Sequence, residues 1–108
     1  MRIVGFILLL ALTVNLPADD FLALRKQAAA GEAEAQYQLG ELLYEARGVA
    51  RDLDASRRWA TQAADQGHAR AQYRIASMQL LGEAGPRDAP AGLALFKKCV
   101  PALTKEAE

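Results

Sequence analysis

The apolar residues of this chain form one continuous run near the start and helical stripes after it. Residues 3–14 are uncharged and almost wholly apolar. From residue 19 onward, apolar residues recur every three or four positions, which is the spacing of one face of an α-helix. No stretch shows the strict alternation of a half-buried strand. The pattern therefore predicts an all-α domain behind an apolar leader.

We predict five helices joined by turns. The clearest stripe combines Ala35, Leu39 and Leu42, and Gly31 lies just beyond the end of the preceding helix, as a C-terminal cap favours. Pro101 is expected to stop the last helix and to leave residues 102–108 as a flexible tail. The predicted helices span residues 19–30, 32–46, 53–66, 69–81 and 89–100.

The stretch at residues 28–40 returns at 64–76, displaced by 36 positions (67 − 31). The register continues beyond it, because Arg51 and Asp52 fall on Arg87 and Asp88. Both aspartates precede a predicted helix and are expected to cap it. A fixed period of this size indicates stacked helix-turn-helix units. The sequence predicts an antiparallel helical stack of about two and a half repeats over residues 19–101.

Gly40 lies in the middle of a predicted helix and becomes Ala76 in the second copy. Glycine inside a helix costs up to about 1 kcal/mol relative to alanine. Its presence suggests that another helix approaches closely at this point.

The repeated motifs resemble those of a known family. Ala-x-Ala-Gln-Tyr-x-Leu-Gly at 33–40, Gly-Val-x-x-Asp at 48–52 and Ala-x-x-x-Trp at 55–59 are similar to the Sel-one-like (Sel1-like) repeat, a relative of the tetratricopeptide repeat. The resemblance implies a short right-handed α-solenoid whose first helix in each repeat lines the concave surface. Ala46 departs from the family pattern, which often has glycine there, and the second turn reads Gly-Glu-Ala-Gly-Pro.

The same resemblance implies which side chains face a ligand. They would form a groove with acids on one helix and an arginine on the next, crossed by two tyrosines in register. Tyrosine, with its flat face and hydroxyl, suits a protein or peptide partner. The simpler interpretation, which we favour for the tyrosines, is that they are packing residues of the repeat and that Glu34 and Arg70 form an ion pair between adjacent helices. The implied partner-binding residues are Glu34, Tyr37, Glu41, Tyr44, Glu45, Arg70, Tyr73, Ser77 and Leu80.

Residues 1–18 combine a basic start, an apolar run and a break before two aspartates. About twelve apolar residues make only about 18 Å of helix, short of the roughly 30 Å hydrocarbon core. We expect a bacterial signal peptide cleaved after Ala18, which would place the protein in the periplasm or outside the cell. A retained inner-membrane anchor and a buried first helix are the alternatives.

Charge and chemistry exclude several function classes. Thirteen basic and thirteen acidic residues balance, so nothing attracts nucleic acid or anionic lipid. Cys99 is the only cysteine and is expected to be buried, the alternative being a disulfide between chains. His68, the only histidine, is interpreted as a solvated residue at a helix start. We expect no metal site and no cofactor, because there are no clustered ligands and no phosphate loop.

Three functions remain open at this level. The first is an exported, non-catalytic adaptor or scaffold that binds a protein or peptide partner in the cell envelope. The second is an envelope enzyme that hydrolyses β-lactams or peptidoglycan fragments. Secreted family members credited with β-lactam activity carry a disulfide in each repeat, and this chain lacks those cysteine pairs. The third is a small membrane-anchored subunit of a larger complex.

Overall fold

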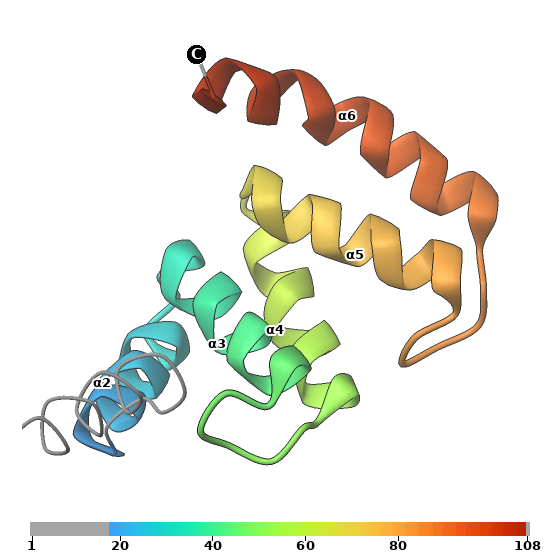
Figure 1. The fold of residues 1–108 in the computed structure, drawn as a ribbon. Helices are drawn as coiled ribbons and strands as arrows, with labels where there is room; N and C mark the ends of the chain where they lie inside the picture. Colours follow the sequence, from blue (N-terminus) through green and yellow to red (C-terminus); the bar gives the residue numbers. More distant parts are fainter. Residues whose placement is uncertain (1–17, 108) are drawn as a thin grey trace, which may run out of the picture.

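The computed structural model describes residues 18–107, and within them it contains five helices and no strand. The expected signal peptide lies outside the described residues, apart from Ala18. Each predicted helix is present, with ends within a few residues of the prediction except at the C-terminus. The helices, labelled in Figure 1, are α2 (Ala18–Ala29), α3 (Ala33–Glu45), α4 (Leu53–Asp65), α5 (Ala69–Leu81) and α6 (Ala89–Ala107).

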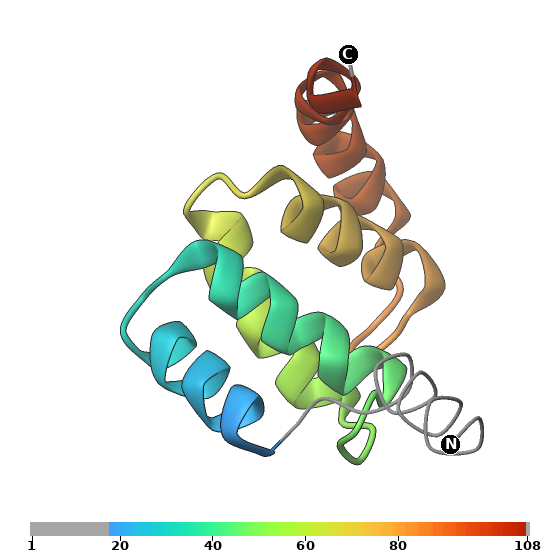
Figure 2. The same ribbon diagram turned by 60° about the vertical axis from the view of Figure 1, so that its left-hand side comes forward.

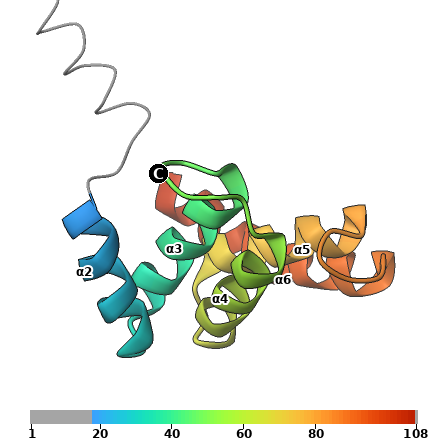
Figure 3. The same cartoon turned by 90° about the horizontal axis from the view of Figure 1, so that it is seen from below.

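Each helix packs on the next one along the chain, from α2 to α6. Figure 2 shows the succession from the side, and Figure 3 shows it from below. Helices α3 and α5 open the two repeats, whereas α4 and α6 close them, and α2 corresponds to a closing helix without its partner. The predicted all-α solenoid of about two and a half repeats is confirmed.

Small residues let the helices of each repeat approach one another closely. A Cβ atom on Gly40 of α3 would lie 3.2 Å from the backbone oxygen of Ser56 in α4. In the second repeat the glycine is on the other helix, since a Cβ atom on Gly92 of α6 would lie 2.9 Å from the backbone oxygen of Ala76. The close approach predicted at Gly40 is therefore present.

Two buried glutamines connect successive units. The Gln36 Nε2 atom donates to the Ala28 carbonyl, 3.1 Å away, and Gln72 makes the same bond to Ala64 at 3.1 Å. Both carbonyls belong to the last turn of the preceding helix, and each also accepts from the amide of the following glycine, Gly31 or Gly67. The glutamine adds a second hydrogen bond and attaches each opening helix to the helix before it.

The turns between the two helices of each repeat follow one plan. The Asp52 carboxylate accepts from the Ala55 amide at 3.0 Å, and Asp88 accepts from Ala91 at 3.1 Å, which confirms both predicted caps. The preceding arginine, Arg51 or Arg87, donates to a carbonyl near the end of the opening helix. The altered second turn therefore keeps the architecture of the first.

The hydrophobic core is built largely from alanine, with a few larger side chains. Leu39, Met78 and Cys99 are among the largest fully buried residues. The expected burial of Cys99 is confirmed, and desolvation raises the pKa of its thiol. A buried neutral thiol acts as a small apolar side chain.

The prediction that Pro101 stops the last helix is wrong. Helix α6 continues through Pro101 to Ala107, so residues 102–107 extend it where a frayed tail was expected. Proline removes one helical hydrogen bond, normally at a cost of about 3 kcal/mol. Pro101 lies on the exposed side of α6, where water can solvate the carbonyl that loses its partner.

Ala46 ends α3 in the left-handed conformation, with φ of 58°, where the second repeat has Gly82 with φ of 73°. A Cβ atom is unfavourable there by roughly 1–2 kcal/mol. We expect Ala46→Gly to raise the free energy of unfolding by about 1 kcal/mol, measured by urea denaturation. Ala23→Gly, at an exposed position within α2, is the control and should lower it by a similar amount. A less stable Ala46→Gly protein would contradict this account.

Candidate functional site

The candidate site is the surface shared by α3, α5 and the end of α6, called here the concave face. It contains a pocket of about 160 Å³. Three of the residues predicted to face a ligand, Tyr37, Glu41 and Tyr73, line this pocket together with a fourth, Arg70. Helix α6 contributes a further wall that the sequence did not indicate. The full lining is Tyr37, Glu41, Arg70, Tyr73, Arg74 and Leu103.

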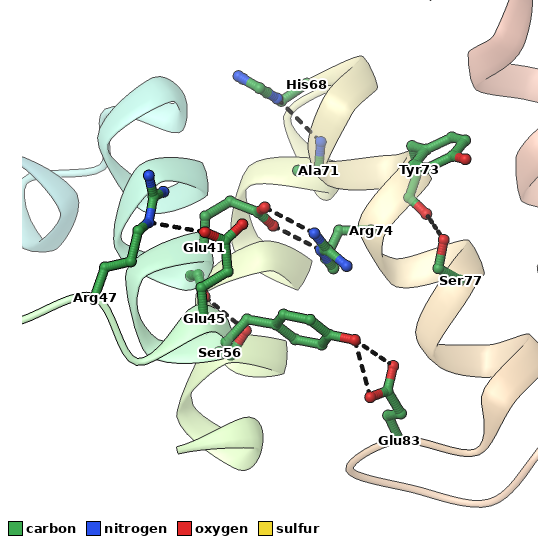
Figure 4. Close-up of polar contacts among 12 residues, drawn as sticks. Glu41, Glu45, Arg47, Ser56, His68, Ala71, Tyr73, Arg74, Ser77 and Glu83 are labelled. Carbon is green, nitrogen blue, oxygen red and sulfur yellow. Dashed lines mark hydrogen bonds and ion pairs between the residues drawn. The ribbon is translucent and has the colours of Figure 1, made fainter. Parts of the chain in front are cut away.

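A bidentate ion pair holds α3 against α5 at the bottom of this face. The Arg74 guanidinium donates to both oxygens of the Glu41 carboxylate, at 2.7 and 2.8 Å (Figure 4). Glu41 is buried, and its hydrogen bonds raise the pKa of Arg74 above the usual value. Arg74 also stacks over the Tyr44 ring, with its guanidinium carbon 4.1 Å from the ring centre. The pair joins the two repeats and leaves neither charge uncompensated.

Tyr44 binds the turn of the second repeat through its hydroxyl group. That hydroxyl donates to the Glu83 carboxylate, with oxygen distances of 2.8 and 2.9 Å, and this bond raises the pKa of Tyr44. The Arg57 guanidinium donates to the Glu83 carbonyl at 3.0 Å. Tyr44 therefore contacts the second repeat in two ways, through its hydroxyl group at Glu83 and through its ring at Arg74.

His68 lies at the start of α5, as the sequence suggested, but its side chain is only 14% exposed, so the expectation that it is solvated is wrong. Its Nδ1 atom accepts from the Ala71 amide at 3.2 Å and caps α5, while its Nε2 atom lies 2.5 Å from the Glu34 carboxylate. Because Nδ1 accepts, the proton resides on Nε2 and is donated to Glu34. The His68 ring also stacks on Tyr37, with centroids 4.7 Å apart.

The other predicted binding residues do not line this pocket. Glu45 pairs with Arg47 at the end of α3, at 2.8 Å. The Ser77 hydroxyl donates to the Tyr73 carbonyl one turn earlier, and Leu80 packs against Gly92 of α6. Tyr73 is different, because it is 48% exposed while its ring meets Phe96 edge-on at 5.0 Å.

Sequence reasoning missed four residues that shape this face: His68, Arg74, Glu83 and Leu103. The sequence did contain a signal for Arg74, because Arg74 and Glu41 carry opposite charges on neighbouring opening helices. Glu83 and Leu103 had no such signal. Glu83 depends on the path of the second turn, and Leu103 depends on the helix continuing past Pro101.

Residues 18–107 hold no group of three or more potential metal ligands. Both ring nitrogens of His68 are engaged, and burial raises the pKa of the Tyr37 hydroxyl, which keeps it protonated. No helix within the described part is long and apolar enough to cross a membrane.

Comparisons with known proteins agree with the geometry. The family model of the Sel1 repeat matches residues 33–68 and 69–98, and the chain belongs to this family. It is similar to a Sel1 repeat protein from Oxalobacter formigenes, with 35% identity over 73% of this chain and a TM-score of 0.71. It is also similar to a protective antigen of uropathogenic Escherichia coli that displays an SLR fold, with 29% identity over 76% of this chain and a TM-score of 0.71.

This chain spans only 23% and 18% of the lengths of those two solved chains. No curated protein matches it. The Sel1 repeat fold commonly mediates protein–protein interaction, and its members are typically non-catalytic scaffolds.

Removing one member of the Glu41–Arg74 pair leaves the other charge partly buried without its partner. We expect Arg74→Met to lower the free energy of unfolding by about 2 kcal/mol, measured by urea denaturation. The double variant Glu41→Gln with Arg74→Met should recover part of that loss, because no lone charge remains. Arg58→Met, on the exposed surface of α4, is the control and should change stability by less than about 0.5 kcal/mol. Equal losses at positions 58 and 74 would show that the pair contributes nothing.

The hydrogen bond from His68 lowers the pKa of Glu34 below its ordinary value of 4.5. A carboxyl group with a lowered pKa in the folded state stabilises the fold above pH 4.5, and this contribution is lost as the pH falls through the lower folded value. Below pH 4.5, we therefore expect the wild type to lose stability more steeply than Glu34→Gln. Thermal unfolding followed by circular dichroism measures the difference.

Glu32→Gln serves as the control, since Glu32 holds the register position of His68 (32 + 36) and makes no side-chain cap bond. Its pH profile should run parallel to that of the wild type. Parallel profiles for wild type and Glu34→Gln would mean that the contact with His68 contributes nothing to stability.

Proposed function

We propose that this protein is an exported, non-catalytic adaptor that binds a protein or peptide partner in the cell envelope through the concave face. The observation that carries the proposal is the exposed side of Tyr73 at the pocket between α3, α5 and α6. A half-exposed tyrosine beside a pocket offers apolar area and a hydroxyl at little entropic cost. The membership in the Sel1 repeat family supports a protein as the partner.

Export is inferred from the first eighteen residues of the sequence. The basic start, the short apolar run and the break before Asp19 are typical of a secretory signal peptide. The proposed location is the periplasm or the cell exterior of a bacterium, and a retained inner-membrane anchor is the alternative. Mass spectrometry of the protein isolated from cells distinguishes them. An N-terminus at Asp19 supports export with cleavage, whereas an intact Met1 supports the anchor.

The absence of catalysis is also part of the proposal. The Cys99 thiol is buried and neutral, and a base role for His68 would require breaking its contact with Glu34 or with the start of α5. A hydrolase acting on β-lactams or peptidoglycan fragments needs an activated nucleophile or a bound water. Turnover of either substrate by the purified protein above background would overturn this part of the proposal.

Partner binding is tested by crosslinking in intact cells. We expect a crosslinked species with the wild type that is lost in Tyr73→Ala, because this change removes the exposed aromatic surface of the concave face. Leu22→Ala is a matched control, since Leu22 is 54% exposed on α2, outside the pocket. Loss of the species in both variants, or in neither, would contradict binding through the concave face.

A further inference from the structure

Helix α6 continues past Pro101 and lines the pocket, whereas the chain turns at the corresponding position of the other units. Leu103 occupies the register position of Gly31 and Gly67 (67 + 36 = 103). Both glycines have positive φ and turn the chain, whereas Leu103 lies within the continued helix. In this position it lines the pocket with Tyr37 and Tyr73. The pocket therefore exists only because the helix does not end at Pro101.

The charged groups around this pocket are already engaged with one another. Arg74 is bound to Glu41, and His68 is bound to Glu34. Arg70 also acts on Glu34, since its positive charge contributes to the lowered pKa of that carboxyl. Because the positive and negative groups balance, an ionic ligand gains little here. The surface that a ligand would newly bury is the ring of Tyr73 and the side chain of Leu103.

The size of the pocket suits one side chain. Its volume of about 160 Å³ is close to that of a cavity of about 150 Å³ that accommodates a benzene molecule. The ring of phenylalanine or tryptophan, or the branched end of leucine, therefore fills much of it.

A second hollow lies on the other side of the Tyr37 and Glu41 side chains. It has a volume of about 440 Å³ and shares these two residues with the pocket. Its apolar lining comes from Leu24 of α2 and Leu42 of α3, and its polar lining from Gln38, Glu45 and Arg47. Two hollows separated by one ridge favour a chain over a single small molecule. In an extended peptide, side chains two residues apart point the same way and lie about 7 Å from each other.

We propose that the concave face binds an extended peptide segment by an apolar anchor. An aromatic or long aliphatic side chain enters the pocket between Tyr37, Tyr73 and Leu103. A second apolar side chain, two residues away, occupies the hollow beside Leu24. The proposal rests on the proposed function and adds the chemistry of the partner to it.

The probe is a library of random linear peptides displayed on phage, selected against the immobilised full chain. Enriched peptides should carry Phe, Trp, Leu or Met at two positions separated by one residue. A selected peptide, made synthetically and titrated by fluorescence anisotropy, should bind Leu103→Ala about tenfold more weakly, since most of a leucine side chain is removed from the contact. Leu103→Trp should weaken binding at least as much, because the larger ring fills the pocket.

Leu93→Ala is the matched control, since Leu93 is a 54% exposed leucine on the same helix and does not line the pocket. The Leu93→Ala protein should bind the peptide with the affinity of the wild type. Circular dichroism should show equal helicity for all variants. Affinity that is unchanged in both Leu103 variants overturns the anchor.

Selected peptides without apolar residues also overturn it, as does a selection that enriches no peptide. In all these cases the crosslinking experiment with Tyr73→Ala still decides separately whether the concave face binds a partner.

Discussion

A buried glutamine attaches each opening helix of this protein to the last turn of the helix before it. The regular helical hydrogen bonds end in that turn, and the carbonyls of Ala28 and Ala64 each accept one from the amide of the corner glycine, at 3.1 and 2.9 Å. Gln36 and Gln72 donate a second hydrogen bond to these carbonyls, with identical donor–acceptor distances of 3.1 Å. Both glutamines are buried, so their amide groups need these partners. The same junction between units therefore recurs 36 residues along the chain.

The repeat explains why most of the fold was predictable from the sequence. Gly31 and Gly67, Asp52 and Asp88, and the glutamines recur at one period, so local signals at each position reinforced those in the other copy. The prediction of where the last helix ends was wrong for a related reason, because the repeat offers no second copy of this boundary. Pro101 has no counterpart in the first copy, and its effect depends on whether the carbonyl one turn earlier faces water or protein, which is a property of the packed structure.

The candidate site was less predictable than the fold. The family pattern gave the helices that face the groove, and Tyr37, Glu41 and Tyr73 do lie at one pocket. It could not give the partners of these side chains. His68 looked like a surface residue because its neighbours in sequence are polar or small, yet Glu34 and Tyr37 reach it from another helix. Contacts between repeats depend on how far each helix is rotated about its own axis, and the spacing of apolar residues does not determine that rotation closely enough.

The glycines at the two helix crossings have a consequence for how such arrays can change. Gly40 of α3 faces Ser56 of α4, whereas Ala76 of α5 faces Gly92 of α6, so each crossing has one glycine but on opposite helices. A hybrid unit that joined α5 to the partner of α3 would have no glycine at its crossing, and the reverse hybrid would have two. The first is overpacked and the second leaves a gap. The two repeats share one architecture, but their helices are not exchangeable parts.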